Sequence, residues 1–219
     1  EVLHYPPELP SFRVQRNGSI TVGPSPASEL PATNLQPFAV AAALMMSELL
    51  VLRGTGVVID GAAVLFVGPS GVGTSSIAAA LVGSGATPLT DQLVALEISA
   101  DSVVARAGPT TIKLWSDMAA ELGIDTADAL RVSNDIDKFT IGWPVASGSV
   151  RVGALLQVQR GDVDRPTLTR LAAGHAAATI VDSQAYHTVA QALDPSILPR
   201  AVTVGQCCPT YSLVRPMVG

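Results

Sequence analysis

Cysteine and charged residues are scarce in this sequence. The two cysteines among the 219 residues, Cys207 and Cys208, are adjacent, so no paired disulfide framework exists and a reducing, cytoplasmic compartment is expected. Charged residues make up 14%, and the 13 Lys and Arg are scattered and outnumbered by 18 Asp and Glu, so neither nucleic acid nor an anionic membrane is an expected partner. The most apolar stretch, 37–52, is interrupted by Ser47 and Glu48 and is too short for a membrane span.

Apolar residues, by contrast, make up 48% of the composition and recur as short runs of Leu, Val and Ala. Such runs are typical of buried strands and of the helices that cover them, so we expect a layered α/β fold. The proline-rich segment 1–37 is predicted to hold one hairpin, formed by 12–15 and 20–22 around Asn17-Gly18. Residues 38–219 are predicted to form the main domain.

The hydrophobic periodicity predicts the order of elements in this domain. Helices are expected at 38–51, 75–82, 115–122, 126–132, 173–182 and 185–193. Strands are expected at 56–59, 63–67, 87–90, 93–96, 152–158, 167–171 and 211–214. The polar stretch 133–138 is predicted to be a loop, in which Asp135, Asp137 and Lys138 either close over a bound ligand or are simply solvated.

A glycine-rich segment lies between the strand at 63–67 and the helix at 75–82. It fits the phosphate-binding pattern G-x-x-x-x-G-K-[ST] at every fixed position but one, and reads Gly68-Pro69-Ser70-Gly71-Val72-Gly73-Thr74-Ser75, followed by Ser76. The glycines let backbone N–H groups turn toward an anion, the helix start adds its positive dipole end, and Ser75 offers a hydroxyl to a magnesium ion. Segment 68–76 is therefore predicted to bind nucleotide phosphates. The alternative is a glycine-rich turn that binds nothing.

The position that differs is Thr74, where the pattern has lysine. The lysine ammonium neutralises charge on the β- and γ-phosphates as the bond breaks, and the short, neutral threonine side chain lacks that charge. Because the amides and the helix dipole remain, phosphate binding is expected to survive while catalysis slows by on the order of a thousandfold. The sequence fits a natural loss of the lysine and an engineered substitution equally well.

Asp91 is the second candidate site residue. It follows the strand at 87–90, downstream of the P-loop helix, where an aspartate can hold magnesium directly or through water. In that role it would share the metal with Ser75. The alternative is that Asp91 caps a turn.

These segments together resemble the catalytic domain of HPr kinase/phosphorylase. The chain is more similar still to the shorter HPr-kinase-related proteins, some of which are peptide serine kinases from lasso-peptide gene clusters. The similarity extends over about residues 36 to 215, and its specific motifs lie within 52–96. The matching segments are Leu52-Arg53-Gly54, Asp60-Gly61, the glycine-rich loop, 88–96 around Asp91, Lys113-Leu114-Trp115 and 209–213.

The resemblance implies a P-loop fold related to phosphoenolpyruvate carboxykinase, with a mixed sheet and flanking helices. It also implies that ATP, or another nucleoside triphosphate, and Mg²⁺ serve to phosphorylate a serine of a small protein or peptide, with Asp91 as metal ligand or general base. Homo-oligomers are a further expectation. Three positions depart from the family: Arg53 stands where histidine is usual, Thr74 where lysine is usual, and Gln92 where a second aspartate is usual.

These departures leave two functions open. One is an ATP-dependent serine kinase with impaired catalysis, in which the guanidinium of Arg53 enters the phosphate site and replaces the missing ammonium, because arginine is always charged and binds phosphate bidentately. The alternative for Arg53 is a surface position at the start of a strand. The other function is a pseudokinase-type binding or scaffolding subunit that recognises a peptide or protein partner without phosphate transfer.

Overall fold

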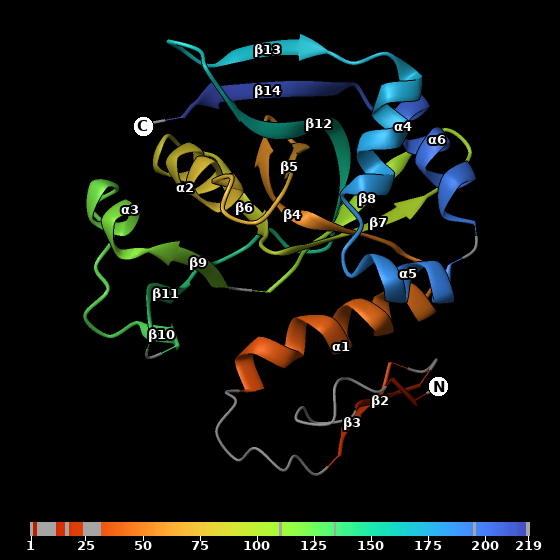
Figure 1. Cartoon of the computed structure of the whole chain (residues 1–219), viewed down its shortest axis with the longest axis horizontal. Helices are drawn as coiled ribbons and strands as arrows, with labels where there is room; N and C mark the ends of the chain where they lie inside the picture. The colour runs from red at the N-terminus through yellow and green to blue at the C-terminus, as the bar shows by residue number, and fades with distance from the viewer. Residues whose placement is uncertain are drawn as a thin grey trace.

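The computed structural model of the chain describes residues 2–3, 12–15, 18–23, 32–109, 111–133, 135–194 and 196–217. Its centre is a mixed sheet of eight strands with helices on both faces (Figure 1). The strands of this sheet are β4 (Leu50–Ile59), β5 (Ala62–Val67), β6 (Thr87–Thr90), β7 (Leu93–Ile98), β8 (Val103–Arg106), β12 (Ser149–Gly161), β13 (Thr167–Arg170) and β14 (Thr210–Pro216).

The strands are paired in the order β13-β14-β12-β5-β4-β7-β8, and β6 also pairs with β4. Strand β12 runs parallel to β14 and β5, whereas the other pairs are antiparallel, so the mixed sheet implied by the resemblance is present. Residues 149–151 of β12 pair with β8, while its later residues pair with β5. The path of paired strands β12-β5-β4-β7-β8 therefore closes on itself.

Two hydrophobic cores cover the two faces of the sheet, because successive residues of a strand point to opposite sides. Leu65 and Val67 of β5 belong to the core beneath α4 and α6, together with Ile180 and Val204. Phe66, between them, belongs to the core beneath α2. The helices of the chain are α1 (Ala32–Met46), α2 (Thr74–Gly83), α3 (Ser116–Glu121), α4 (Ala173–Asp182), α5 (His187–Leu193) and α6 (Ile197–Cys207).

Two smaller sheets accompany the central one. The first contains β1 (Val2–Leu3), β2 (Phe12–Val14) and β3 (Ile20–Val22), and the pairing of β2 with β3 confirms the expected hairpin, although Asn17 of its turn lies outside the described residues. The second has the order β10-β11-β9 and lies beside α2 and α3 (Figure 1). Its strands are β9 (Thr111–Trp115), β10 (Leu130–Ser133) and β11 (Ile136–Gly142).

Several sequence-based predictions of secondary structure were wrong. The helix expected at 126–132 is a turn followed by β10, and the loop expected at 133–138 contains the start of β11. The helix expected at 38–51 begins at Ala32 and ends at Met46, because Leu50 and Val51 pair with β7 as part of β4. Helix α1 thus spans the boundary predicted between 1–37 and 38–219, and that division stays a prediction. Helix α6 was not expected.

Neither cysteine lies in a strand. Cys207 ends α6 and Cys208 follows it in the core beneath that helix, where burial raises the pKa of its thiol to about 12. Both cysteines are free thiols.

Within the described ranges, no helix has the length and apolar character needed to cross a membrane.

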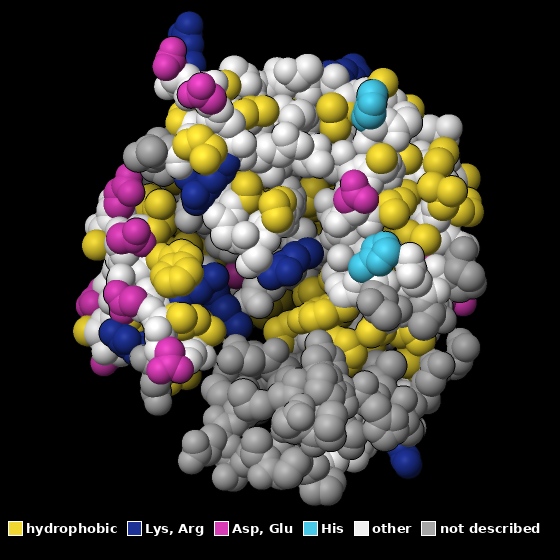
Figure 2. Space-filling view, in the orientation of Figure 1, with side chains coloured by type: hydrophobic (Ala, Val, Ile, Leu, Met, Phe, Trp, Pro, Cys, Tyr) yellow, Lys and Arg dark blue, Asp and Glu magenta, His cyan; other side chains and the backbone are white. Residues whose placement is uncertain are grey.

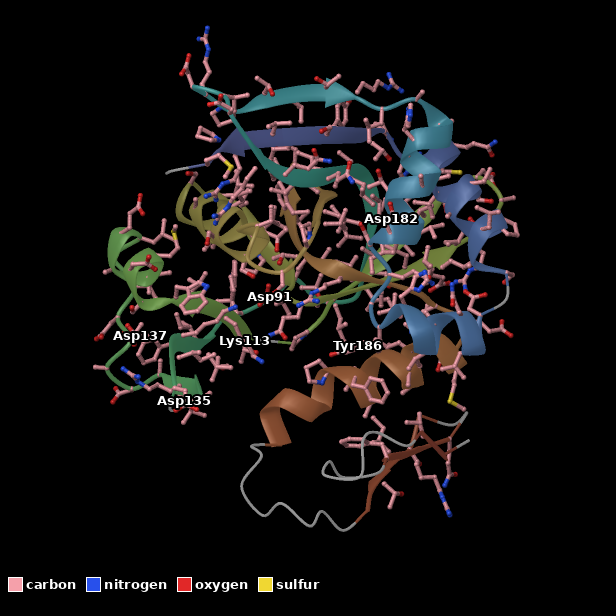
Figure 3. All side chains as sticks on the ribbon, viewed as in Figure 1. Asp91, Lys113, Asp135, Asp137, Asp182 and Tyr186 are labelled. Carbon is pink, nitrogen blue, oxygen red and sulfur yellow. The ribbon has the colours of Figure 1, made fainter. Side chains whose placement is uncertain are left out.

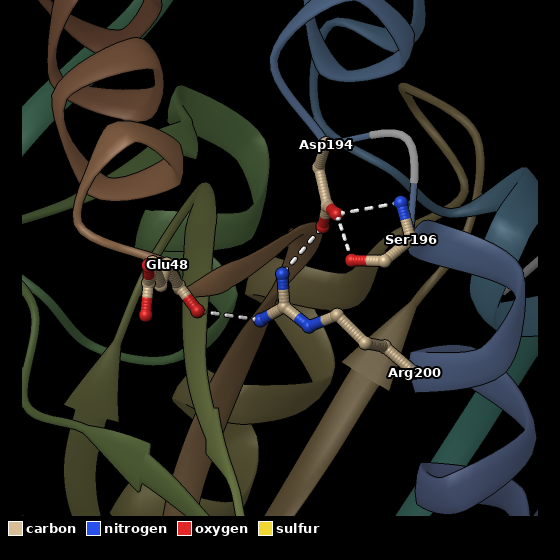
Figure 4. Close-up of polar contacts among 4 residues, drawn as sticks. All are labelled: Glu48, Asp194, Ser196 and Arg200. Atoms are coloured by element: carbon tan, nitrogen blue, oxygen red, sulfur yellow. Dashed lines mark hydrogen bonds and ion pairs between the residues drawn. The ribbon is translucent and has the colours of Figure 1, made fainter.

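A group of polar contacts centred on Asp194 and Arg200 joins α6 to the turn before β4 (Figure 4). Arg200 of α6 forms an ion pair with Asp194, which is 7% exposed, and donates a second hydrogen bond to the carbonyl oxygen of Glu48 at 2.7 Å. The backbone N–H and the hydroxyl of Ser196 donate to Asp194 at 3.1 and 2.7 Å. This clamp fixes α6 against the strand that carries Arg53.

Candidate functional site

The glycine-rich segment connects β5 to α2, as the order of strand, loop and helix predicted. Gly71 and Gly73 have φ values of 82° and 100°, a region that favours glycine, and Gly73 immediately precedes α2. A Cβ atom on Gly68 would lie 2.7 Å from the carbonyl oxygen of Val158 on β12. Two of the glycines are therefore required by the backbone conformation, and the third by close packing against the sheet.

The backbone of this loop offers N–H donors that the described part of the chain does not use. No acceptor among the described residues is found for the N–H groups of Gly71, Gly73, Thr74 and Ser75. Unpaired donors at the start of a helix, combined with the positive end of its dipole, attract an anion. Arg160 of β12 donates to the carbonyl oxygen of Gly71 at 3.0 Å and ties the loop to the sheet.

The loop opens into a cavity of about 420 Å³, within the size range of small-molecule sites. Figure 2 shows this hollow in the middle of the face, with cationic side chains on both sides of it. Three cations line the cavity, and none of the described lining residues is acidic. They are Arg53 of β4, Lys113 of β9 and Lys138 of β11.

Asp91 lies next to the loop, at the end of β6, and is 2% exposed. The hydroxyls of Thr55 and Ser75 both donate to its Oδ1 at 2.8 Å, and the backbone N–H of Lys113 donates to its Oδ2 at 3.1 Å. These contacts connect β4, α2 and β9 through one carboxylate. A carboxylate that caps a turn accepts hydrogen bonds from residues next to it in sequence. All three donors to Asp91 come from distant parts of the chain instead.

Ser75 and Asp91 together fit a magnesium ion. Magnesium prefers oxygen ligands. The hydroxyl of Ser75 and the carboxylate of Asp91, in contact beside the unpaired N–H groups of the loop, are the oxygens it would find here. Among the described residues, no group of three or more His, Cys, Asp or Glu side chains could hold a metal. Phosphate and water oxygens would therefore have to complete the coordination of a metal bound by this pair.

Arg53 was predicted to approach the phosphate site from a neighbouring strand. Its successor in β4, Gly54, pairs with Val67, the residue that precedes the loop. The Arg53 side chain is exposed and lines the cavity, while its backbone N–H donates to the carbonyl oxygen of Ser183 at 2.7 Å. The structure brings Arg53 to the same cavity as Thr74, and its role as a substitute for lysine stays a prediction.

Lys113 was not predicted as a site residue. In β9 the side chains of Ile112 and Leu114 are buried in the core beneath α2, so Lys113 between them faces the other way, into the cavity. Burial lowers the pKa of the Lys113 ammonium, the charge of Lys138 lowers it further, and the Asp91 carboxylate acts in the opposite direction. The alternation of Ile112, Lys113 and Leu114 was the available sequence signal, but the strand itself was not predicted.

Of the three polar residues singled out in the segment 133–138, Lys138 alone lines the cavity. Its Nζ lies 5.7 Å from the centroid of the Trp115 ring. Asp135 and Asp137 are exposed and are not among the residues lining this cavity, and Figure 3 shows them farther out than Asp91 and Lys113. Asp137 is bound on the surface instead, where it forms an ion pair with Arg131 at 2.8 Å and accepts a hydrogen bond from the hydroxyl of Ser116.

A second cavity of about 540 Å³ adjoins the first and has a more apolar lining. The two share Pro37, Gln92, Leu93 and Lys113, and Asp91 lines the second. Gln92 has a φ of 67°, which is uncommon for a residue other than glycine and is associated with strained, functional positions. The chain therefore has an apolar hollow directly beside the cationic one.

Comparisons with known proteins add little to this geometry. No family model matches the chain, and no curated protein matches it. Among solved structures, the chain is similar to the Hpr(Ser) kinase/phosphatase from Coxiella burnetii, with a TM-score of 0.38 and 12% sequence identity over 76% of this chain and 79% of that one. This neighbour belongs to the group that the sequence resembles, but a match this weak shows neither the family nor the function of the chain.

Proposed function

We propose that this chain binds the phosphates of ATP, or of another nucleoside triphosphate, together with Mg²⁺, in the cavity at loop 68–75. The observation that carries the proposal is the hydrogen bond between Ser75 and Asp91 beside the unpaired N–H groups of the loop. An anion site and a hydroxyl–carboxylate pair suited to a hard cation are the combination that a metal–polyphosphate complex needs.

Each part of the site has a separate role in this proposal. The N–H groups of Gly71, Gly73 and Thr74 bind phosphate oxygens, and Ser75 with Asp91 holds the metal, which when bound neutralises phosphate charge. Arg53, whose neighbour Gly54 pairs with the residue that precedes the loop, binds a phosphate from β4. Asp91 suits metal binding better than proton abstraction, because both of its oxygens already accept hydrogen bonds from fixed donors.

The resemblance extends this proposal to phosphate transfer onto a serine of a small protein or peptide, with impaired catalysis because Thr74 supplies no charge. The second candidate is recognition of a peptide or protein partner without transfer. The apolar cavity beside Asp91 and Lys113 supports it, because this hollow offers a partner an apolar surface whether or not transfer occurs. Measuring transfer from labelled ATP to candidate peptides, with the chain and with Thr74→Lys, separates the two.

Ser75→Ala tests the proposed function directly. Removing the hydroxyl takes away one metal ligand, so we expect the affinity for a non-hydrolysable ATP analogue to fall by about tenfold in the presence of Mg²⁺ and to change little without it. Isothermal titration calorimetry measures both values. The matched control is Ser84→Ala, at the other end of α2, whose hydroxyl is exposed and donates to the carbonyl oxygen of Ala80. Equal Mg²⁺-dependent affinities for Ser75→Ala and the unmodified chain would contradict the proposal.

A further inference from the structure

Lysine occurs only twice in the 219 residues, at Lys113 and Lys138, and the eleven other cationic residues are arginines. Both lysines line the cavity at the P-loop. They come from different strands, and neither lies in the loop whose own lysine position is Thr74. The chain thus places all of its lysine side chains at one site.

The pairing of β9 with β11 sets the two lysines side by side. Lys138 is opposite Trp115, and Lys113 is opposite Thr140, so all four side chains share one face of the small sheet. The lysines are diagonal neighbours on this face, a relation that places Cα atoms roughly 7–8 Å apart. The backbone N–H of Lys113 donates a hydrogen bond to Asp91, which also accepts one from the hydroxyl of Ser75. These two hydrogen bonds hold this face of the small sheet next to the loop.

Neither lysine of this face forms an ion pair with a described protein group. Asp137, which precedes Lys138 in sequence, is paired with Arg131. The Asp91 carboxylate attracts the Lys113 ammonium, but it forms no ion pair with it and already accepts three hydrogen bonds. Arg53 adds a third positive charge at the same cavity. Like charges at one cavity that form no ion pair favour a bound anion of high charge.

We propose that Lys113 and Lys138 form a two-lysine clamp for adjacent phosphates of a polyphosphate, in place of the single lysine that the loop lacks. The inference rests on the proposed function and extends it to two residues outside the loop. Two ammonium groups on neighbouring strands are spaced to contact two linked phosphates, whereas a single phosphate ion cannot engage both as well. The clamp therefore prefers pyrophosphate and nucleoside di- and triphosphates to inorganic phosphate.

Because the sequence has two lysines, reductive methylation with ¹³C-formaldehyde gives two lysine signals in an NMR spectrum, besides that of the terminal amine. Methylation keeps the positive charge. On titration with pyrophosphate and Mg²⁺, we expect both lysine signals to shift and to saturate at the affinity that calorimetry gives for the unmodified chain. Inorganic phosphate should shift them only at higher concentration.

Substitutions provide the second half of the test. Lys113→Met and Lys138→Met are each expected to weaken pyrophosphate binding by about tenfold, and Lys113→Arg to retain most of it. Introducing Thr74→Lys into the Lys113→Met chain should restore affinity, because it returns a positive charge to the loop. Arg170→Met removes an exposed charge on β13 and serves as the control.

The outcomes separate this inference from the proposed function. If the unmodified chain binds pyrophosphate while both lysine signals stay unmoved, the clamp is wrong and the P-loop site stands. If the chain binds neither pyrophosphate nor nucleotide, both are wrong. Circular dichroism checks that the variants are folded, and should a methionine variant unfold, the lysine signals of the unmutated chain decide.

Discussion

Asp91→Asn is expected to leave the chain folded and to abolish the Mg²⁺ dependence of nucleotide binding. The asparagine has the same shape, and with its amide reversed its oxygen can accept from the Lys113 N–H while its NH₂ group donates to the hydroxyl of Thr55 or Ser75. The carboxylate charge that attracts the metal is lost. We expect affinity for a non-hydrolysable ATP analogue in Mg²⁺ to fall by roughly one to two orders of magnitude.

Calorimetry with and without Mg²⁺ measures this effect, and urea denaturation checks the fold. Asp137→Asn is the matched control, because Asp137 is an exposed aspartate of the β9–β11 region that does not line the cavity. Mg²⁺-dependent binding by Asp91→Asn equal to that of the unmodified chain would show that the metal is held elsewhere or not at all.

Asp194→Ala should have the largest effect on stability. It removes the carboxylate that pairs with Arg200 and accepts twice from Ser196. The largely buried guanidinium keeps its hydrogen bond to the carbonyl oxygen of Glu48 (Figure 4). Breaking one side of a buried ion pair costs about 3 kcal/mol in the free energy of unfolding. Urea denaturation measures the loss.

The control for the Asp194–Arg200 contacts is Asp182→Ala, at the exposed last residue of α4. Its effect should stay within about 0.5 kcal/mol, as for surface substitutions in general. An Asp194→Ala chain as stable as the Asp182→Ala chain would mean that the contacts joining α6 to the turn before β4 add nothing to stability.

The conformation of the glycine-rich loop was predictable from sequence because its determinants are local. Gly71 and Gly73 supply the backbone conformations, Gly68 the close packing, and the flanking strand and helix are contiguous with them. Asp91 was predicted from its place after a strand, and Ser75 from its place in the loop. Their hydrogen bond depends on the packing of α2 against the end of β6, which follows once both elements are placed.

The cationic wall of the cavity was not predictable in the same way. Lys113 and Lys138 reach the site through the pairing of β9 with β11, whose strands lie more than 20 residues apart in sequence. The intervening segment was assigned to helix, because short apolar runs fit both periods and only tertiary pairing decides between them. A prediction that lacks β9 and β11 cannot place Lys113 and Lys138 at the cavity.

The start of β4 shows the same limit on a smaller scale. Leu50 and Val51 continue the apolar run of α1, so composition alone extends the helix through them. In the structure Glu48 takes a φ of 64°, the chain reverses, and Leu50 pairs with Leu96 of β7. A long-range strand pairing outweighed helix propensity at these residues.

The most direct test of the central claim is a titration of ¹⁵N-labelled chain with Mg²⁺ and a non-hydrolysable ATP analogue, followed through the backbone amide signals. We predict the largest shifts at Gly71, Gly73, Thr74 and Ser75, because their N–H groups would then donate to phosphate oxygens. Shifts that saturate elsewhere while these four amides stay unchanged would contradict the assignment of the loop as a phosphate site.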